Sequence, residues 1–301
     1  MDVGVIGTGM MGQNHVRVYS ELKEVDSVVI YDVNADQAKK VASNNNAEVA
    51  DSYESLFHSV DAVSLCVPTP FHYEVALKII HAGMHMLIEK PICLSSIEGK
   101  KLAEQIPEDL IVGVGHIERF NPIVSEISQM ISNPLYIEFK RHNPTSSRVT
   151  GSSVVEDLMI HDIDIMLHSL GCSGASVQAK GNDDVAAALF TKGYSLIYLS
   201  ASRKASKKIR MIHIEQEDMT IQGDFMTQEI YVYRKPGQYK VERDRYVQEN
   251  IVEKVLVAKQ EPLRTELSSF LNSVKTNKPF PITPLEAIQN LELCEQIKGL
   301  F

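Results

Sequence analysis

The sequence has few cysteines, no long apolar run and no basic segment at its start. Its four cysteines, Cys66, Cys93, Cys172 and Cys294, form no CxxC pair, which argues against a disulfide framework and against a cysteine zinc site. Apolar runs stay well short of the roughly 20 residues that a membrane-spanning helix needs, and the first residues lack the basic region of a signal peptide. We therefore expect a cytoplasmic protein with no membrane partner.

Positive charge is also scarce, since 30 Lys and Arg residues stand against 39 Asp and Glu residues. Because nucleic-acid binding depends on neutralising phosphates with cations, this balance argues against a nucleic-acid partner. The segment from Arg203 to Arg210 is locally basic, but it is short and indicates a solvated strand end. The 44% of hydrophobic and 23% of charged residues are typical of a soluble globular protein. A length of 301 residues suggests two domains of roughly 100 to 200 residues each.

Apolar, β-rich runs alternate with helical patterns in the first part of the chain. This alternation predicts βαβ units on a parallel sheet with helices on both faces, which is a doubly wound, Rossmann-type α/β domain. Gly83 is placed to end one of the helices, and Ser95 to Glu98 have the form of a capping box. The expected strands are 3–6, 27–31, 62–67, 85–88 and 110–114.

The pattern changes after Asn121 and Pro122, and most later segments are typical of antiparallel strands with one buried face. We place the boundary so that residues 1–119 form the first domain and residues 120–301 form an α+β domain. Helices are expected at about 154–170, 263–276 and 284–298. The expected strands are 135–142, 184–189, 196–202, 209–215, 219–222 and 229–234.

The glycine motif Gly7-Thr8-Gly9-Met10-Met11-Gly12 follows an apolar strand directly and opens a helical pattern, which is the context in which GxGxxG indicates a dinucleotide site. Gly7 permits the tight turn, Gly9 lets the backbone approach the pyrophosphate, and Gly12 lets the helix pack closely on the strand. Asp32 ends the second strand, where a carboxylate can bind the ribose hydroxyls and would repel a 2′-phosphate. The motif therefore favours NAD over NADP. The alternatives are a chance glycine turn and, for Asp32, a turn residue.

Glu89-Lys90-Pro91 follows the strand at 85–88, at the carboxyl edge where doubly wound folds place their ligands. We expect Lys90 to reach both the substrate and the nicotinamide, the alternative being a surface lysine at a strand end. Besides Gly7, Gly9, Gly12 and Asp32, the residues assigned to the cofactor site are Thr8, Met10, Met11, Val67, Thr69, Glu89 and Lys90.

Asp157 and His161 are spaced i, i+4, so a helix from about residue 154 would present both on one face. An imidazole can accept the carbinol proton as the hydride leaves, and a carboxylate can orient the ring. The alternatives are an ion pair on the helix surface and a core histidine bonded to backbone. Asp162 and Asp164 lie on the same helix without ligands from a second segment, so we expect no metal.

Other histidines and polar residues near strand ends are interpreted by position. His15 and His72 are interpreted as packing or capping residues. His116, Arg119 and Asn121 follow the strand at 110–114 and are expected to reach hydroxyls or a phosphate of the substrate.

Taken together, these motifs resemble the glucose-fructose oxidoreductase and inositol dehydrogenase (Gfo/Idh/MocA) family of NAD(P)-dependent sugar and cyclitol dehydrogenases. The resemblance covers essentially the whole chain, from the glycine motif through residues 89–91, 119–122 and 157–164 to the two C-terminal helices. It implies that Lys90 and His161 act at the oxidised carbon and that Asp157 supports the site. It also implies an open antiparallel sheet in the second domain, whose exposed face mediates homodimer or homotetramer formation.

Residues 115–122 and 154–158 are most similar to the nucleotide-sugar members, the UDP-N-acetylglucosamine 3-dehydrogenases. Such a substrate needs cations for its diphosphate, for which Arg119, Arg141 and Arg148 are candidates. We therefore expect NAD-dependent oxidation of a carbinol of a sugar or nucleotide sugar to a ketone, with either His161 or Lys90 as the principal base. The residues assigned to the substrate are Lys90, His116, Arg119, Asn121, Arg148, Asp157 and His161.

Three alternatives stay open. The substrate can be a free sugar or inositol. The chain can be a non-catalytic NAD-binding regulator of the same fold. Finally, the enzyme can perform reduction or elimination on a sugar ring with tightly held NAD that is recycled internally.

Overall fold

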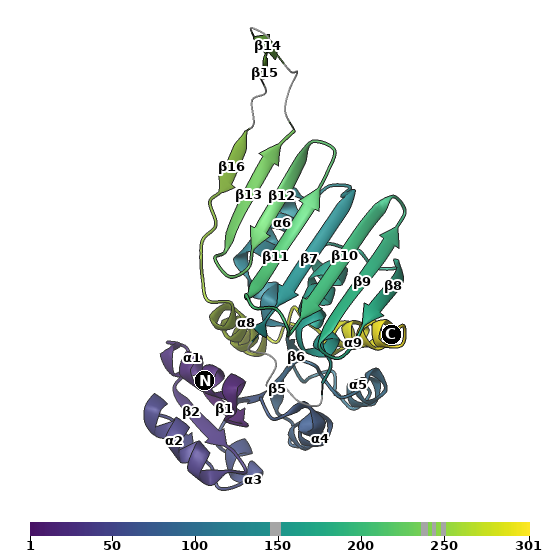
Figure 1. The fold of residues 1–301 in the computed structure, drawn as a ribbon. Coiled ribbons are helices and arrows are strands. Elements are labelled where there is room, and N and C mark those ends of the chain that lie inside the picture. Colours follow the sequence, from purple (N-terminus) through teal and green to yellow (C-terminus); the bar gives the residue numbers. More distant parts are fainter. Residues whose placement is uncertain (145–151, 236–239, 243–244, 248–250) are drawn as a thin grey trace. The chain divides into compact units, whose positions relative to one another are not determined.

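The computed structural model describes residues 1–144, 152–235, 240–242, 245–247 and 251–301, which fall into two compact units (Figure 1). The first unit comprises Met1–Phe120 and Glu261–Glu292, and the second comprises Asn121–Gln260 and Leu293–Phe301. The division after Phe120 lies next to the boundary expected from the sequence. The return of Glu261–Glu292 to the first unit was not expected.

The first unit is built on a six-stranded parallel sheet with the order β3-β2-β1-β4-β5-β6. The doubly wound parallel sheet expected from the sequence is therefore confirmed. From β1 the chain adds β2 and β3 on one side and β4, β5 and β6 on the other, so the order reverses between β1 and β4. Folds of this class bind ligands at that switch point, outside the carboxyl ends of the strands. The strands are β1 Asp2–Ile6, β2 Ser27–Tyr31, β3 Glu48–Val49, β4 Ala62–Leu65, β5 His85–Glu89 and β6 Val112–Gly115.

Helices of the first unit begin and end with local signals. The Asn34 side chain caps α2 by accepting from the Gln37 N–H at 3.1 Å, and Ser95 caps α5 by accepting from the Glu98 N–H at 3.2 Å. Gly83, with φ of +71°, follows the end of α4 as expected. The helices are α1 Met10–Glu21, α2 Ala35–Asn45, α3 Tyr53–Phe57, η1 Thr69–Phe71, α4 His72–His81, α5 Ser96–Ala103 and η2 Ile117–Phe120.

Two helices close the chain, α8 Pro262–Thr276 and α9 Pro284–Lys298, and the division between the units falls within α9. Helix α8 packs on α1 and η2 through an apolar stripe that includes the buried Leu267 and Phe270. The Phe270 ring meets the Phe280 ring edge-on at 6.1 Å between centroids. Among the described residues, none of the helices has both the length and the hydropathy needed to cross a bilayer.

The second unit contains an eight-stranded sheet with the order β16-β13-β12-β11-β7-β10-β9-β8, which is antiparallel except for the parallel pair β7 and β10 (Figure 1). The expected, mostly antiparallel sheet is confirmed. Helix α6, Pro122–Met130, packs on β12, and the segment around residue 155 packs on β7 and β10. The strands are β7 Tyr136–His142, β8 Ser176–Gly181, β9 Val185–Lys192, β10 Ser195–Ser202, β11 Ile209–Glu215, β12 Met219–Asp224, β13 Glu229–Arg234 and β16 Val252–Val255, with a separate pair β14 Lys240–Glu242 and β15 Arg245–Val247.

The helix expected at 154–170 is present, but most of it is not an ordinary α-helix. It consists of the π-helix η4 Val155–Met159, one α-helical turn α7 Ile160–Asp164 and the π-helix η5 Ile165–Ser169. A π turn closes its hydrogen bonds from i to i+5, and π segments occur frequently at functional sites. The segment therefore departs from the regular α-helix that the i, i+4 spacing of Asp157 and His161 assumes.

Candidate functional site

The three glycines of the loop between β1 and α1 have different surroundings. Gly7 has φ of +89°, and a Cβ on it would lie 2.7 Å from the Val67 backbone nitrogen. A Cβ on Gly12 would lie 1.8 Å from the Gly7 carbonyl oxygen. By contrast, a Cβ on Gly9 would meet no described atom within 4 Å, although Gly9 is the N-cap residue of α1. Gly7 and Gly12 are thus required by the fold, whereas Gly9 leaves the N-terminus of α1 open to an anion.

Asp32 follows β2 and ties this loop to the neighbouring strand. Its Oδ2 accepts from the Thr8 N–H at 2.6 Å and from the Thr8 hydroxyl at 2.8 Å, and its Oδ1 accepts from the Asn34 N–H at 2.9 Å. An ionised carboxylate offers about four acceptor sites, so capacity remains for ribose hydroxyls. The next residue, Val33, is 88% exposed and brings no cation that would suit a 2′-phosphate.

The other residues expected at the cofactor lie along the same edge of the sheet. Met10 begins α1 and is exposed, while Met11 is half-buried. Val67 follows β4 and lies against Gly7, and Thr69 begins the short helix η1. The structure therefore brings the glycine loop and the segment after β4 together, and this cradle fits the pyrophosphate part of a dinucleotide.

Lys90 is half-buried in the segment that follows β5. Its backbone N–H donates to Glu89 Oε2 at 3.1 Å. The His72 ring links this segment to the one after β4, because its Nδ1 lies 2.9 Å from the Pro91 carbonyl oxygen and its Nε2 lies 2.9 Å from the Val67 carbonyl oxygen. Burial lowers the pKa of His72, although both hydrogen bonds oppose that shift. His72 thus has the packing role expected for it, and it connects two segments of the candidate site.

A buried cluster of ionisable residues lies beside Lys90, and no motif or spacing in the sequence indicates it as a cluster. His15 on α1, Glu89 at the end of β5 and Glu266 on α8 place one nitrogen and two carboxylate oxygens within 4.8 Å of one another. Such a set can ligate a metal, but His15 Nε2 already forms a hydrogen bond of 3.0 Å with Glu89 Oε1. We interpret the group as a hydrogen-bonded cluster.

In the second unit, Asp157 forms an ion pair with Arg203. The guanidinium donates to Asp157 Oδ2 at 3.3 Å, and the exposed fractions of the two side chains are 4% for Arg203 and 17% for Asp157. The interpretation of Arg203 as part of a solvated strand end is therefore wrong, because the residue is buried directly after β10. His161, half-buried on α7, lies four positions beyond Asp157.

A second buried ion pair lies next to the first. Arg141, near the end of β7, donates from Nε and Nη2 to Asp162 Oδ1 at 2.9 and 2.7 Å, and both side chains are at most 2% exposed. Arg141 pairs with Ala201 across the parallel strands β7 and β10, and Arg203 lies two residues beyond Ala201. Both arginines therefore lie near the carboxyl ends of these two strands. Asp157 lies in the π-helix η4, and Asp162 lies in the following turn α7. Buried in this pair, Arg141 is not available to a diphosphate.

The remaining residues expected at the substrate are engaged within the protein. His116 is 1% exposed and its Nε2 lies 3.3 Å from the Asn290 amide nitrogen. Arg119 forms an ion pair of 3.2 Å with Glu286. Asn121 is the N-cap of α6, where its Oδ1 accepts from the Ile123 N–H and its amide donates to the Phe225 carbonyl. Arg148 lies outside the described residues.

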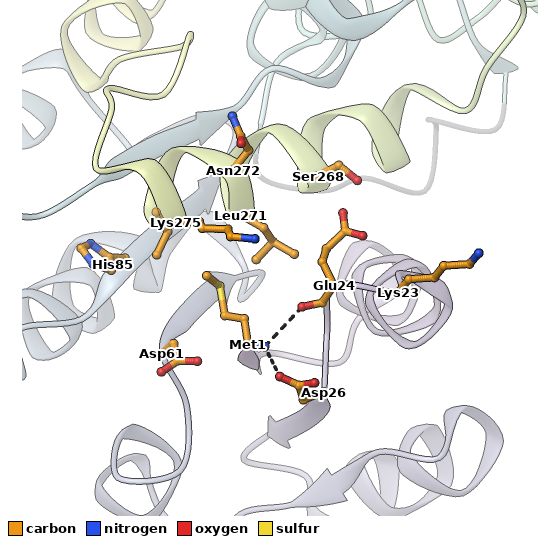
Figure 2. A pocket seen from close by; sticks show the side chains of 11 residues that line it. Met1, Lys23, Glu24, Asp26, Asp61, His85, Ser268, Leu271, Asn272 and Lys275 are labelled. Carbon is orange, nitrogen blue, oxygen red and sulfur yellow. Dashed lines mark hydrogen bonds and ion pairs between the residues drawn. The ribbon is translucent and has the colours of Figure 1, made fainter.

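A pocket of about 800 Å³ lies at the opposite edge of the parallel sheet (Figure 2). Met1, Asp61 and His85, at or just before the starts of β1, β4 and β5, line it together with Leu271 and Lys275 of α8. The Met1 ammonium donates to the Glu24 carbonyl at 3.2 Å and pairs with Asp26. The carboxyl ends of the strands, where the glycine loop and Lys90 lie, are remote from this pocket, so we do not assign the cofactor to it.

The amino-acid sequence of the chain is similar to those of several known proteins. A family described as oxidoreductases with an NAD-binding Rossmann fold matches residues 1–119. A UDP-N-acetylglucosamine 3-dehydrogenase from Acidithiobacillus ferrooxidans is 32% identical over 288 residues, which cover 93% of this chain and 90% of that protein. An inositol 2-dehydrogenase from Serratia proteamaculans is 29% identical over 191 residues, which cover 59% of this chain and 57% of that protein.

The fold of the chain is also similar to those of solved structures. One structure of the Acidithiobacillus ferrooxidans enzyme matches with a TM-score of 0.89 at 30% identity and covers 100% of this chain and 97% of that chain. Levoglucosan dehydrogenase in complex with NADH and levoglucosan matches with a TM-score of 0.83 at 18% identity and covers 100% of this chain and 96% of that chain. At that identity the second match shows a shared fold.

Proposed function

Since the chain belongs to the Gfo/Idh/MocA oxidoreductase family, we propose that this dehydrogenase oxidises a nucleotide sugar, and that its substrate is UDP-N-acetylglucosamine, oxidised at carbon 3. The observation that carries the proposal is the identity of 32%, spread over 93% of the chain, with an enzyme of that name. Residues 1–119 would bind the dinucleotide, and residues 120–301 would supply the substrate site and the oligomer contacts.

NAD rather than NADP is the proposed cofactor. The support comes from Asp32, whose carboxylate would accept hydrogen bonds from the adenosine ribose and repel a 2′-phosphate. The cradle formed by Gly9 and the N-terminus of α1 would hold the pyrophosphate.

The proposed mechanism divides the reaction among Lys90, His161 and Asp157. Oxidation of a carbinol to a ketone removes a proton from the hydroxyl and a hydride from the carbon, and the nicotinamide supplies the hydride acceptor when it is bound. His161 takes the hydroxyl proton, while the Lys90 ammonium stabilises the negative charge that develops on the oxygen. Asp157, held by Arg203, supports the charge on the imidazole. The alternative is that Lys90 is the principal base, because a cationic nicotinamide nearby would favour the neutral form of its amine.

Inositol is the second candidate substrate. It is favoured by the match to an inositol 2-dehydrogenase, which covers 59% of this chain. A cyclitol carries no diphosphate, so it would need none of the cations that a nucleotide sugar requires.

For the assembly, we propose a homodimer or homotetramer that uses the outer face of the eight-stranded sheet. The support is a group of apolar side chains on that face, including Leu189, Leu196 and Met211, which are 37%, 44% and 40% exposed. Neighbouring apolar side chains on an uncovered sheet face favour association.

Incubating the purified protein with NAD⁺ and single candidate substrates tests the proposal. We expect absorbance at 340 nm, from NADH, with UDP-N-acetylglucosamine, and at least about 10-fold less kcat/KM with UDP-glucose, N-acetylglucosamine or myo-inositol. Lys90→Met and His161→Ala should each lower kcat by about 100-fold or more, the range for loss of an acid–base group. Lys101→Met, at an exposed lysine of α5, is the matched control and should keep the wild-type rate.

Each contrary outcome removes a defined part of the proposal. Activity with myo-inositol and none with any UDP-sugar would replace the substrate. Wild-type rates in both site variants would exclude the proposed mechanism. NADH binding without turnover of any sugar, nucleotide sugar or cyclitol would favour a regulator.

A further inference from the structure

The His15, Glu89 and Glu266 cluster is buried where a folded core ordinarily holds apolar side chains. The exposed fractions are 0% for the His15 side chain and 9% for that of Glu89, and Glu266 is 0% exposed. Burying a charge costs several kcal/mol unless it is paired and hydrogen-bonded, so polar groups in such a place need a purpose. The hydrogen bond between the Lys90 N–H and the Glu89 carboxylate indicates a function for these groups in positioning Lys90.

Both oxygens of the Glu89 carboxylate are used. Oε1 lies 3.0 Å from His15 Nε2, and Oε2 accepts from the Lys90 N–H at 3.1 Å. The neighbouring strand leaves room for this arrangement, because Glu89 pairs with Gly115 across β5 and β6. A Cβ on Gly115 would approach the carboxylate to 3.3 Å, so any larger residue there would crowd it. The carboxylate thus connects the α1 imidazole to the backbone of Lys90.

The charge on Glu89 depends on His15. Burial raises the pKa of Glu89, but the hydrogen bond and the charge of His15 outweigh it, with help from Lys90, and hold the pKa below its ordinary value. Among the described residues, Glu266 from α8, Cys66 after β4 and His72 of α4 are further ionisable groups near Glu89. Without His15, the buried carboxyl would have a second carboxyl nearby and would hold its proton to a higher pH.

We propose that His15 is a positioning residue for Lys90, acting through the Glu89 carboxylate that accepts the Lys90 N–H. This inference rests on the proposed role of Lys90 in the reaction. His15 lies 75 positions before Lys90 and would touch neither substrate nor cofactor. Its effect is to keep ionised the acceptor that fixes the segment from which the Lys90 ammonium extends. A displacement of a reacting group by about 1 Å can lower a rate by about 100-fold.

The test is the pH profile of kcat for His15→Leu, measured with NAD⁺ and UDP-N-acetylglucosamine, or with whichever substrate the screen identifies. Toward the acidic end of the profile we expect kcat to fall by about 10- to 100-fold, because Glu89 holds its proton to a higher pH without His15 and a neutral carboxyl is a weaker acceptor for the Lys90 N–H. As the pH rises and Glu89 ionises, kcat should recover toward the wild-type value. His15→Gln, which keeps a donor to Glu89, should retain kcat within about threefold at every pH.

A double variant, His15→Leu with Glu89→Met, separates positioning from packing. Replacing both partners by apolar groups of similar size costs little stability, so this variant should fold. Without the carboxylate, its kcat should stay low at all pH values and show no recovery. NADH affinity, measured by fluorescence titration, should stay within about twofold in the two single variants of His15. His81→Leu, at an exposed histidine of α4, is the control and should match the wild type.

Two outcomes would overturn the inference. One is a loss in His15→Leu that is the same at every pH, which is what a purely structural role predicts. The other is one tightly bound divalent metal per chain, measured by mass spectrometry, that disappears in His15→Leu. If Lys90→Met keeps the wild-type rate, the proposed role of Lys90 fails instead, whatever the His15 profile shows.

Discussion

Gly7 and Gly12 are constrained by neighbouring backbone atoms, but nothing among the described residues limits the size of residue 9. An alanine Cβ at position 12 would meet the Gly7 carbonyl oxygen at 1.8 Å, whereas at position 9 it would meet open space. Gly9 also has φ of −64°, which any residue can adopt. We propose that position 9 lacks a side chain because a ligand approaches the backbone there, which would separate binding from folding within one motif.

Alanine substitutions at Gly12 and Gly9 should have different effects, the first on stability and the second on NADH binding. Gly12→Ala forces backbone atoms apart, so we expect the free energy of unfolding to fall by about 2 to 4 kcal/mol, at or above the usual range for overpacking. Gly9→Ala should leave the midpoint of thermal unfolding within about 2 °C, but it should weaken NADH binding by about 10-fold or more. Calorimetry and fluorescence titration measure the two effects. Unchanged NADH affinity in Gly9→Ala would argue against a pyrophosphate at this position.

Local signals explain which site residues could be read from the sequence. Glycine spacing, strand ends and the Glu89-Lys90-Pro91 segment depend on near neighbours, and the structure places them on the expected edge of the sheet. The partners of other polar residues are distant in the chain. Glu286 reaches Arg119 across 167 positions, and Phe225 accepts from Asn121 across 104. No spacing rule predicts such pairs, so position at a strand end alone does not show which of these side chains are bonded within the protein.

The helical segment that carries His161 shows the same limit at the scale of the element. Apolar spacing predicts its length, but it cannot separate a π-helix from an α-helix, because the two differ by about one residue per turn. Within this segment Asp157 pairs with Arg203, and Asp162 pairs with Arg141. Two buried ion pairs therefore hold the segment that presents His161.

Removing the guanidinium of Arg203 should both destabilise the second unit and disturb catalysis. In Arg203→Leu the mostly buried Asp157 loses its cationic partner. We therefore expect the free energy of unfolding, measured in urea, to fall by about 2 to 4 kcal/mol. The double variant with Asp157→Asn should recover part of that loss, and the cycle gives the coupling energy. As control, Lys204→Ala breaks an ion pair with Asp184 in which the side chains are 61% and 41% exposed, and it should cost under about 1 kcal/mol. Equal losses in Arg203→Leu and Lys204→Ala would contradict the structural role given to Arg203.

Strands were predictable where one face is buried and not where both are exposed. The interior strand β7 alternates strictly between buried and half-buried positions, and the expected range differs from the observed one by a single residue. The edge strands β8 and β16 have no buried residue; β8 alternates only Val177 and Ala179 with polar residues, and β16 has no such alternation. The edge strand β3 has only two residues, which is too short for any period to be visible.

At the scale of the whole molecule, the first unit is completed by a segment from the end of the chain. The Val114 N–H donates to the Ile282 carbonyl at 3.1 Å, and a Cβ on Gly113 would lie 2.3 Å from the Phe280 ring. Residues 1–119, the part matched by the family, thus lack part of their own core when taken alone. A boundary read from the sequence as one point cannot represent a chain that returns to its first unit.

The second unit leaves one sheet face with apolar side chains at its surface, and the proposed oligomer would cover it. Leu189 lies opposite Tyr198 across β9 and β10, and Leu196 is on the same face two residues before Tyr198. Along these strands the alternate residues, such as Ile197 and Leu199, are fully buried. The outward set is therefore separate from the core, and it can be changed without disturbing the fold.

Replacing Leu189 and Leu196 together by lysine tests this assembly. Because both side chains are already 37% and 44% exposed in the single chain, the double variant should unfold at nearly the wild-type temperature. In a dimer, each lysine would place a desolvated charge in the interface, so we expect the mass from light scattering to fall to that of one chain, 33.6 kDa. Leu285→Lys, at a residue of α9 that is 65% exposed and belongs to the first unit, should keep the wild-type mass. An assembly that survives both lysines would have to use another surface, and the exposed leucines would then need a different explanation.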